Sequence, residues 1–286
     1  MSAFLEYFVD QIRKNGVNVF SVSAYEGDQL ETVTLAENNP CQNIYSVAKA
    51  FTVTAIGLLA DRGMLDVEEK VTDILGADCP EDAHPYWQDT TVHMVLKHQL
   101  GLPKNFLDID SFDARAFGRD YLKYMLTYPL TCPAGGEKVY TDGAYYLLAR
   151  MVEKRAGESL DNFMWRELFF PLGFREAAWS HCPMGHAMGA TGLYIRSEDM
   201  AKLGKLYLNG GVWEKQRLLS RTWVDTVLQR GYELVPREAD PTAYGKGGMR
   251  GQMLMVLPEK NRVVAWQGFV TEKKVNLEAI AAAFEG

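Results

Sequence analysis

A chain of 286 residues can bury a large core, either as one large domain or as two interleaved domains. Its 47% hydrophobic and 23% charged residues are typical of a globular protein, and its formal net charge of −7 disfavours nucleic acid and anionic membranes as partners. No stretch reaches the roughly 18 consecutive apolar residues that a membrane helix needs.

Acidic residues interrupt the apolar N-terminal segment, so the sequence predicts no secretory signal. Glu6 and Asp10 fall among its apolar residues, and no cationic start precedes them. The four scattered cysteines form no C-x-x-C pair, which favours free thiols in a reducing compartment. We therefore expect a cytoplasmic protein that acts on a small-molecule substrate, with its oligomeric state left open.

In chain order, apolar spacing and turn residues predict a helix, a β-hairpin, a long mainly helical region, two helices, two strands and a closing helix. Their ranges are 4–15, 17–25 with 31–36, 46–185, 197–208, 220–229, 252–257, 262–269 and 273–284. This order predicts an α+β fold, with an antiparallel sheet built from both termini and flanked by helices. Residues 1–45 and 186–286 would form this sheet lobe, and residues 46–185 an inserted, mainly helical lobe.

A hydroxyl and an amine begin an otherwise apolar helix in the stretch "SVAKAFTVTAIGLL". Ser46 and Lys49 are three residues apart, so they share a helix face and can meet. Serine is a weak nucleophile, and a lysine can take its proton only in the neutral form, which burial favours. A Ser-x-x-Lys pair arises by chance about once in a chain of this size, so the motif needs context.

Two later stretches supply that context. A Pro/Gly loop delivers Tyr140 and Asp142 just before a helix that ends at Gly157, and a tyrosine there can act as a general acid or base. We prefer Tyr140 to Tyr207, which falls at the end of the helix predicted over 197–208. The second stretch, Lys246-Gly247-Gly248-Met249, precedes a predicted strand. Its glycines allow close approach of a ligand, and its lysine offers a positive charge to a substrate carboxylate.

Together these stretches resemble the serine β-lactamase and penicillin-binding-protein-like superfamily, and most closely its class C β-lactamase-related serine hydrolases. That branch uses S-x-x-K, then Y-x-N, then K-T-G or H-T-G. The stretches "TVHMVLKHQLGLP", "PLGF" and "TGLYIRSEDMAKLGKLYLNGG" are also similar, so the resemblance covers about residues 17–270. It implies a β-lactamase/transpeptidase-like fold with the active site between the lobes.

The resemblance also implies an acyl-enzyme mechanism with no metal or organic cofactor. Ser46 would attack a carbonyl, and Lys49 and Tyr140 would move the protons. The backbone amides of Ser46 and Met249 would form the oxyanion hole, while Asp142, Lys246, Gly247 and Gly248 would bind or orient the substrate.

Two residues depart from the pattern of that branch. Asp142 replaces the asparagine of Y-x-N, and an ionised carboxylate near Lys49 would favour the ammonium form and weaken the base. Gly247 replaces the usual threonine, which removes one hydrogen bond to a substrate carboxylate, and Arg250 is a candidate to compensate. Both changes favour an esterase, amidase or peptidase over a dedicated β-lactamase or cell-wall peptidase.

The sequence also fits two alternative hypotheses about the kind of protein. One is a non-catalytic ligand-binding protein on the same fold, in which Asp142 and Gly247 mark the loss of activity. The other is a metalloprotein that uses His181, Cys182 and His186, with His84 or Cys79, although this spacing is far from known metal-ligand patterns. We expect His98 to be structural.

Overall fold

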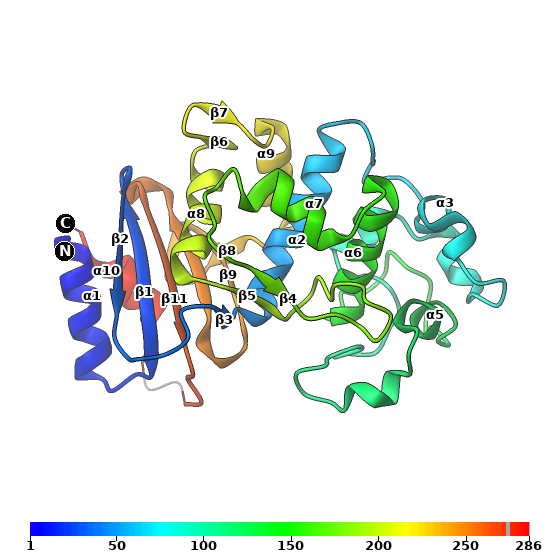
Figure 1. Cartoon of the computed structure of the whole chain (residues 1–286), viewed down its shortest axis with the longest axis horizontal. Helices are drawn as coiled ribbons and strands as arrows, with labels where there is room; N and C mark the ends of the chain where they lie inside the picture. Colours follow the sequence, from blue (N-terminus) through cyan, green and yellow to red (C-terminus); the bar gives the residue numbers. More distant parts are fainter. Residues whose placement is uncertain (273–274, 286) are drawn as a thin grey trace. The chain divides into compact units, whose positions relative to one another are not determined.

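The structure is a computed structural model that describes residues 1–272 and 275–285, and it combines helices with antiparallel strands (Figure 1). The α+β prediction is therefore confirmed. The chain divides into two compact units: residues 1–50, 170–178 and 193–286 form the first, and residues 51–169 and 179–192 form the second. The domain borders predicted from the sequence, at 45/46 and 185/186, stay a prediction.

The first unit is built on a six-stranded antiparallel sheet with the strand order β2-β1-β11-β10-β9-β8. Both parts of the sequence predicted to form the sheet contribute, since β1 pairs with β11 in a register that puts Ala24 opposite Val264. The strands are β1 (Val19–Glu26), β2 (Gln29–Thr34), β8 (Val235–Arg237), β9 (Asp240–Gly247), β10 (Met253–Leu257) and β11 (Arg262–Gly268).

Helices cover both faces of this sheet. In Figure 1, α1 (Ala3–Lys14) and α10 (Leu277–Ala283) lie on one side, where their apolar faces form a core with residues such as Val22, Met255 and Trp266. The other face packs against α8 (Ser197–Leu208). Gly204 permits this close packing, because a Cβ there would lie only 2.6 Å from a side-chain carbon of Val263.

The remaining elements of the first unit are short. β3 pairs antiparallel with β5, and β6 pairs with β7. The bounds are β3 (Gln42–Asn43), η1 (Tyr45–Val47), β5 (Leu193–Ile195), β6 (Val212–Trp213), β7 (Gln216–Arg217), α9 (Arg221–Arg230), η6 (Met249–Gly251) and η7 (Pro258–Lys260). β4 (Ala178–Trp179) lies where the chain passes from the first unit to the second.

The second unit is mainly helical, and α6 (Asp142–Ala156) is its central helix. Most of α6 is buried, and α3, α4 and α7 pack against it. The elements that complete this unit are α2 (Ala48–Ala60, which begins in the first unit), α3 (Val71–Leu75), η2 (Gly76–Asp78), η3 (Pro85–Asp89), α4 (Val92–Leu96), η4 (Ala114–Phe117), α5 (Tyr121–Leu126), α7 (Leu160–Met164) and η5 (Trp165–Phe169).

The predicted elements compare closely with the observed ones. The first helix, the hairpin, the 197–208 helix and the two late strands are confirmed, as is Ser220 as the N-cap of α9. The closing helix is shorter than predicted because it begins at Leu277, and Lys273 and Lys274 lie outside the described residues. The sequence missed β8 and β9.

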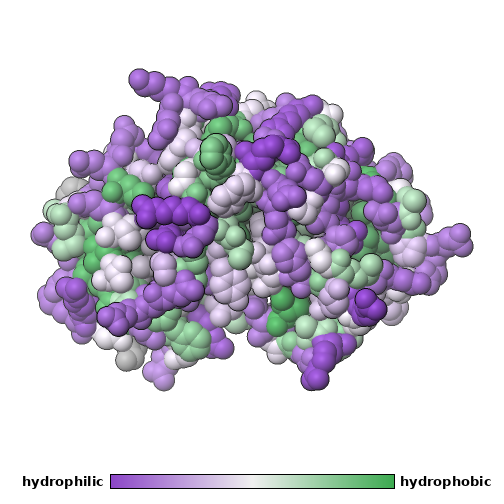
Figure 2. Space-filling model, viewed as in Figure 1, coloured by the Kyte–Doolittle hydropathy of each residue, from purple (hydrophilic) through white to green (hydrophobic). Residues whose placement is uncertain are grey.

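Hydrophobic residues form small groups among hydrophilic ones on the face drawn in Figure 2. Within residues 1–272 and 275–285, no helix combines the length and the apolar character that a membrane crossing requires.

Candidate active site

Ser46 and Lys49 meet as the sequence predicts. Ser46 lies in the short 3-10 turn η1, and Lys49 lies in the first turn of α2, which follows directly. The Lys49 Nζ donates a hydrogen bond to Ser46 Oγ at 3.1 Å, and the lysine is 0% exposed. A hydroxyl and a buried amine are therefore in contact at the start of an apolar helix.

The backbone just before Ser46 is unusual. Tyr45 has φ of 48°, in the left-handed region that non-glycine residues rarely adopt. Its N–H donates to Asn43 Oδ1 at 2.8 Å, which holds the turn in this conformation. Strained backbone of this kind concentrates at functional sites, where it fixes the direction of a side chain. The sequence alone gave no sign of it.

The glycine loop after β9 lies directly against the Ser46 turn. A Cβ at Gly248 would be 2.5 Å from the Ile44 carbonyl oxygen and 3.3 Å from Val47 Cγ2, so only glycine fits. Gly248 is also the N-cap of η6, and Met249 is the first residue of that turn. Amides in a first turn have no acceptor within the helix, so the Met249 N–H can donate to another group.

Lys246 is buried and forms an ion pair with Glu233. Its side chain is 11% exposed and that of Glu233 is 6% exposed. The sequence predicts a lysine charge available to a substrate, whereas the structure shows that charge already balanced by a carboxylate. Sequence reasoning missed Glu233, although a charged residue between the apolar Tyr232 and Leu234 was a possible signal.

The Met253 side chain lies close to Gly247. A Cβ at this position would lie 3.3 Å from the terminal Met253 methyl, tighter than an ordinary contact. Arg250, the candidate for compensation, has φ of 60°, and its guanidinium lies 4.9 Å from the centre of the Phe269 ring. Arg250 therefore stacks on an aromatic side chain.

Tyr140 and Asp142 lie in the second unit, at the start of α6. The Tyr140 ring is half-buried and packs against His98, with 4.6 Å between the ring centres. Thr141 caps α6: its Oγ1 accepts from the Gly143 N–H at 3.2 Å, and its own N–H donates to His98 Nδ1 at 3.3 Å. His98 thus holds this loop in place, which is a structural role.

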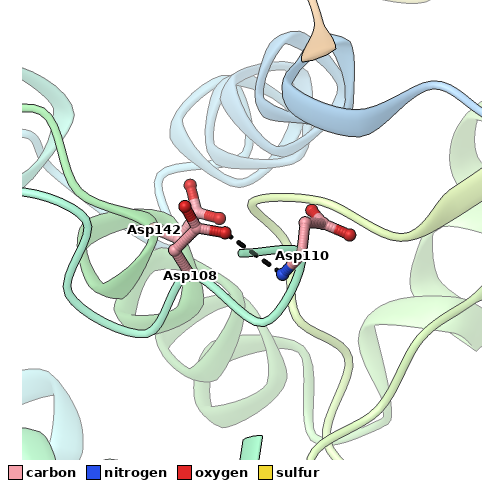
Figure 3. A group of neighbouring side chains, drawn as sticks. All are labelled: Asp108, Asp110 and Asp142. Carbon is pink, nitrogen blue, oxygen red and sulfur yellow. Dashed lines mark hydrogen bonds between the residues drawn. The ribbon is translucent and has the colours of Figure 1, made fainter. Parts of the chain in front are cut away.

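Asp142 is the first residue of α6 and is only 7% exposed. Figure 3 shows its carboxylate beside that of Asp108, with Asp110 nearby, and one carboxylate oxygen from each of these three residues lies within 4.8 Å of the other two. The Asp110 N–H donates to Asp108 Oδ1 at 3.1 Å, and Thr191 Oγ1 donates to the Asp110 carboxylate.

These three aspartates are the group in the described part of the chain that could hold a metal ion, and oxygen ligands suit Ca²⁺ or Mg²⁺. The histidines of the alternative metalloprotein hypothesis are not brought together. His181 hydrogen-bonds to Asp161 at 2.9 Å, and His186 hydrogen-bonds to Glu153 at 2.7 Å.

The cysteines do not offer a competing nucleophile in the first unit. All four are free, as predicted. Burial first, and then the hydrogen bond to the Glu176 carboxylate, raise the pKa of the Cys41 thiol to about 11. This thiol therefore stays protonated at neutral pH, and the thiolate is the reactive form.

Comparison with known proteins identifies relatives along most of the chain. A family model described as Beta-lactamase matches residues 25–283. A 6-aminohexanoate-dimer hydrolase from Paenarthrobacter ureafaciens is 27% identical over 240 residues, which cover 77% of this chain and 59% of that protein. The chain thus spans less than two thirds of this relative's length.

Solved structures show the same fold. A penicillin-binding protein homologue from Caulobacter crescentus superposes with a TM-score of 0.74 at 16% identity, covering 98% of this chain and 96% of that one. A D-stereospecific amidohydrolase from Streptomyces sp. gives a TM-score of 0.69 at 16% identity, with 99% and 98% covered. The placement in the class C branch stays a prediction.

Proposed function

Because this chain belongs to the β-lactamase family, we propose that it is a serine hydrolase that forms an acyl-enzyme on Ser46 with a small ester, amide or peptide substrate. The observation that carries the proposal is the 3.1 Å hydrogen bond between Lys49 Nζ and Ser46 Oγ. Burial favours the neutral form of an amine, which is the form that can accept the serine proton. The family membership gives the motif the context that it lacks alone.

The proposed reaction begins with Ser46. Lys49 takes the hydroxyl proton while Oγ bonds to the substrate carbonyl carbon, and the carbonyl oxygen becomes an oxyanion. The amides of Ser46 and Met249 donate to that oxygen, and each such donor is worth about 10²–10³ in rate. The tetrahedral intermediate then collapses, and the leaving group takes a proton from Tyr140 as the bond to it breaks.

Water completes the proposed cycle. It attacks the ester carbonyl while the Tyr140 phenolate takes one of its protons. The bond to Ser46 then breaks as Lys49 returns its proton to Oγ, which restores all three residues. Of the three substrate classes, we favour amides. One relative is named as a 6-aminohexanoate-dimer hydrolase and one structural neighbour as an amidohydrolase.

Covalent labelling tests the proposal directly. A fluorophosphonate probe is expected to modify the protein once, at Ser46, as located by peptide mass spectrometry. Ser46→Ala removes the nucleophile and is expected to abolish labelling, and Lys49→Met removes the base and is expected to slow it by about 10²-fold or more. Paired anilide and phenyl ester substrates then distinguish amidase from esterase activity.

A second buried lysine provides a matched control. Lys205 is 4% exposed, and its Nζ donates a hydrogen bond to the Gly27 carbonyl at 2.8 Å. Lys205 is far from Ser46 in the sequence, and this hydrogen bond does not involve Ser46. Lys205→Met is expected to label at the wild-type rate in its folded fraction. Folded wild-type protein that resists the probe would instead support the non-catalytic binding protein.

A further inference from the structure

Glu233 is held in a rare backbone conformation between α9 and β8. Its φ is 64°, and the Leu234 N–H donates to the Tyr232 carbonyl at 2.8 Å, the bond of a γ-turn centred on Glu233. γ-turns with positive φ are uncommon and strained. Tyr232 and Leu234 on either side are both 0% exposed, so the surrounding core holds the turn in place.

This turn brings the Glu233 carboxylate to Lys246. β8 pairs with β9 so that Val235 lies opposite Gly245. Glu233 lies two residues before Val235, and Lys246 is the residue after Gly245. The two side chains form an ion pair that is almost entirely removed from solvent. Such a pair is costly to break by removing one partner, because the other charge is then left buried.

The ion pair lies on the strand that leads to the Ser46 turn. β9 packs beside η1, and Gly248, two residues after Lys246, abuts the Ile44 carbonyl. All of these residues belong to the first unit. A substrate group that reaches Lys246 would therefore meet Glu233 as well.

We propose that Glu233 is a specificity-determining residue: by neutralising Lys246, it makes the site select neutral or cationic substrates over those with a carboxylate at this position. A substrate carboxylate would have to share one lysine with a second carboxylate, and like charges at close range in a partly buried site repel strongly. Gly247 offers no hydroxyl to compensate. The proposal rests on the proposed function, since it concerns the substrate of the same site.

Binding to a Ser46→Ala variant tests this without requiring catalysis. The ligands are matched anilides: the butanoyl, pentanoyl and hexanoyl compounds are neutral, and the succinyl, glutaryl and adipoyl compounds of equal length carry a carboxylate. Calorimetry is expected to show that the best neutral anilide binds at least about tenfold tighter than the best anionic one. Equal binding, or tighter binding of a carboxylate, would overturn the proposal.

Glu233→Gln in the same background unmasks the Lys246 charge. The preference is expected to reverse, with a carboxylate anilide binding about tenfold tighter than its neutral partner. Glu278→Gln is the matched control, because Glu278 forms a different ion pair of the first unit. That pair is half-buried, and it joins Glu278 to Arg237 at 2.6 Å. This control is expected to retain the neutral preference. A Glu233→Gln protein that folds and keeps that preference would contradict the role of Glu233.

The comparison in the Ser46→Ala background also stands alone if Glu233→Gln fails to fold. The outcome of this binding comparison also does not depend on the outcome of the fluorophosphonate labelling test. If the fluorophosphonate does not label the folded wild-type protein, the serine hydrolase proposal is rejected. If the Ser46→Ala protein prefers the carboxylate anilides, only the role of Glu233 is rejected.

Discussion

Two buried lysines of the first unit have different surroundings. Lys49 donates to the Ser46 hydroxyl, and Lys246 is paired with the Glu233 carboxylate. At the scale of single residues, this contrast fits the proton-transfer role proposed for Lys49 and the balanced charge of Lys246.

Replacing Asp142 by Asn is expected to move the pH–rate profile of hydrolysis to lower pH, by about 1 unit. Asp142 lies two residues after Tyr140, and its negative charge favours the protonated forms of nearby bases. Removal of that charge allows proton transfer to begin at lower pH. The measurement is kcat/KM for a neutral ester or anilide over a range of about pH 5–10.

Asp110→Asn is the control for that change. Asp110 belongs to the same group of aspartates but is exposed, so water screens its charge. We expect its profile to match that of the wild type. Superimposable profiles for Asp142→Asn and the wild type would show that Asp142 takes no part in the proton transfer.

The elements differ in how far the sequence predicts them, for physical reasons. α1 and α8 each bury one apolar stripe, and this local pattern is visible in the sequence. β9 carries Pro241, Gly245 and Gly247, residue types that disfavour strands, so it was missed. The neighbouring strand β10 requires glycine at one of these positions, because a Cβ at Gly245 would lie 2.2 Å from the Leu254 carbonyl oxygen.

The parts of the candidate site also differ in how far the sequence predicts them. Contact between Ser46 and Lys49 follows from helical spacing, a local property, and could be predicted. The pairing of Glu233 with Lys246 depends on the register of β8 with β9, which no short-range pattern specifies. The catalytic roles of Ser46, Lys49 and Tyr140 stay predictions. So do the substrate-binding or orienting roles of Asp142, Lys246, Gly247, Gly248 and Met249.

Gly248→Ala tests the contact between the η6 and η1 turns. The added Cβ meets the Ile44 carbonyl oxygen at 2.5 Å, and this backbone atom cannot yield as a side chain can. We expect a loss of about 1–3 kcal/mol in stability and of about 10²-fold or more in kcat, because the Met249 amide moves. Thermal unfolding and ester hydrolysis measure the two effects.

Gly247→Ala, one residue earlier, is the control for Gly248→Ala. Its Cβ meets only the terminal methyl of Met253, which can rotate away. A Gly248→Ala variant with the rate and the melting temperature of Gly247→Ala would contradict the close contact between the two turns.

At the scale of the whole molecule, one arginine ties the two ends of the chain to the sheet. Arg262 is 1% exposed, and it donates to Glu26 Oε1 at 2.8 Å and to the Phe284 carbonyl at 3.1 Å. Its guanidinium also lies 4.2 Å from the centre of the Phe4 ring. These contacts connect α1, β1, β11 and the segment after α10.

Arg262→Met is expected to lower the free energy of unfolding by about 3 kcal/mol, because it breaks a buried, hydrogen-bonded ion pair. Urea unfolding measures the loss, and fluorophosphonate labelling of the folded protein is expected to stay at the wild-type rate. Arg221→Met removes an exposed pair with Asp225 and serves as the control, with an expected change below about 0.5 kcal/mol. Equal urea midpoints for Arg262→Met and Arg221→Met would contradict this stabilising role of Arg262.

The pairing of β1 with β11 has a consequence for synthesis. While the ribosome is still translating, β1 has only β2 as a neighbour, and its true partner emerges about 240 residues later. The central strands, and the glycine loop that packs against the Ser46 turn, therefore come together only after β11 has been synthesised. Until then, a nascent chain would expose an unpaired strand edge to chaperones.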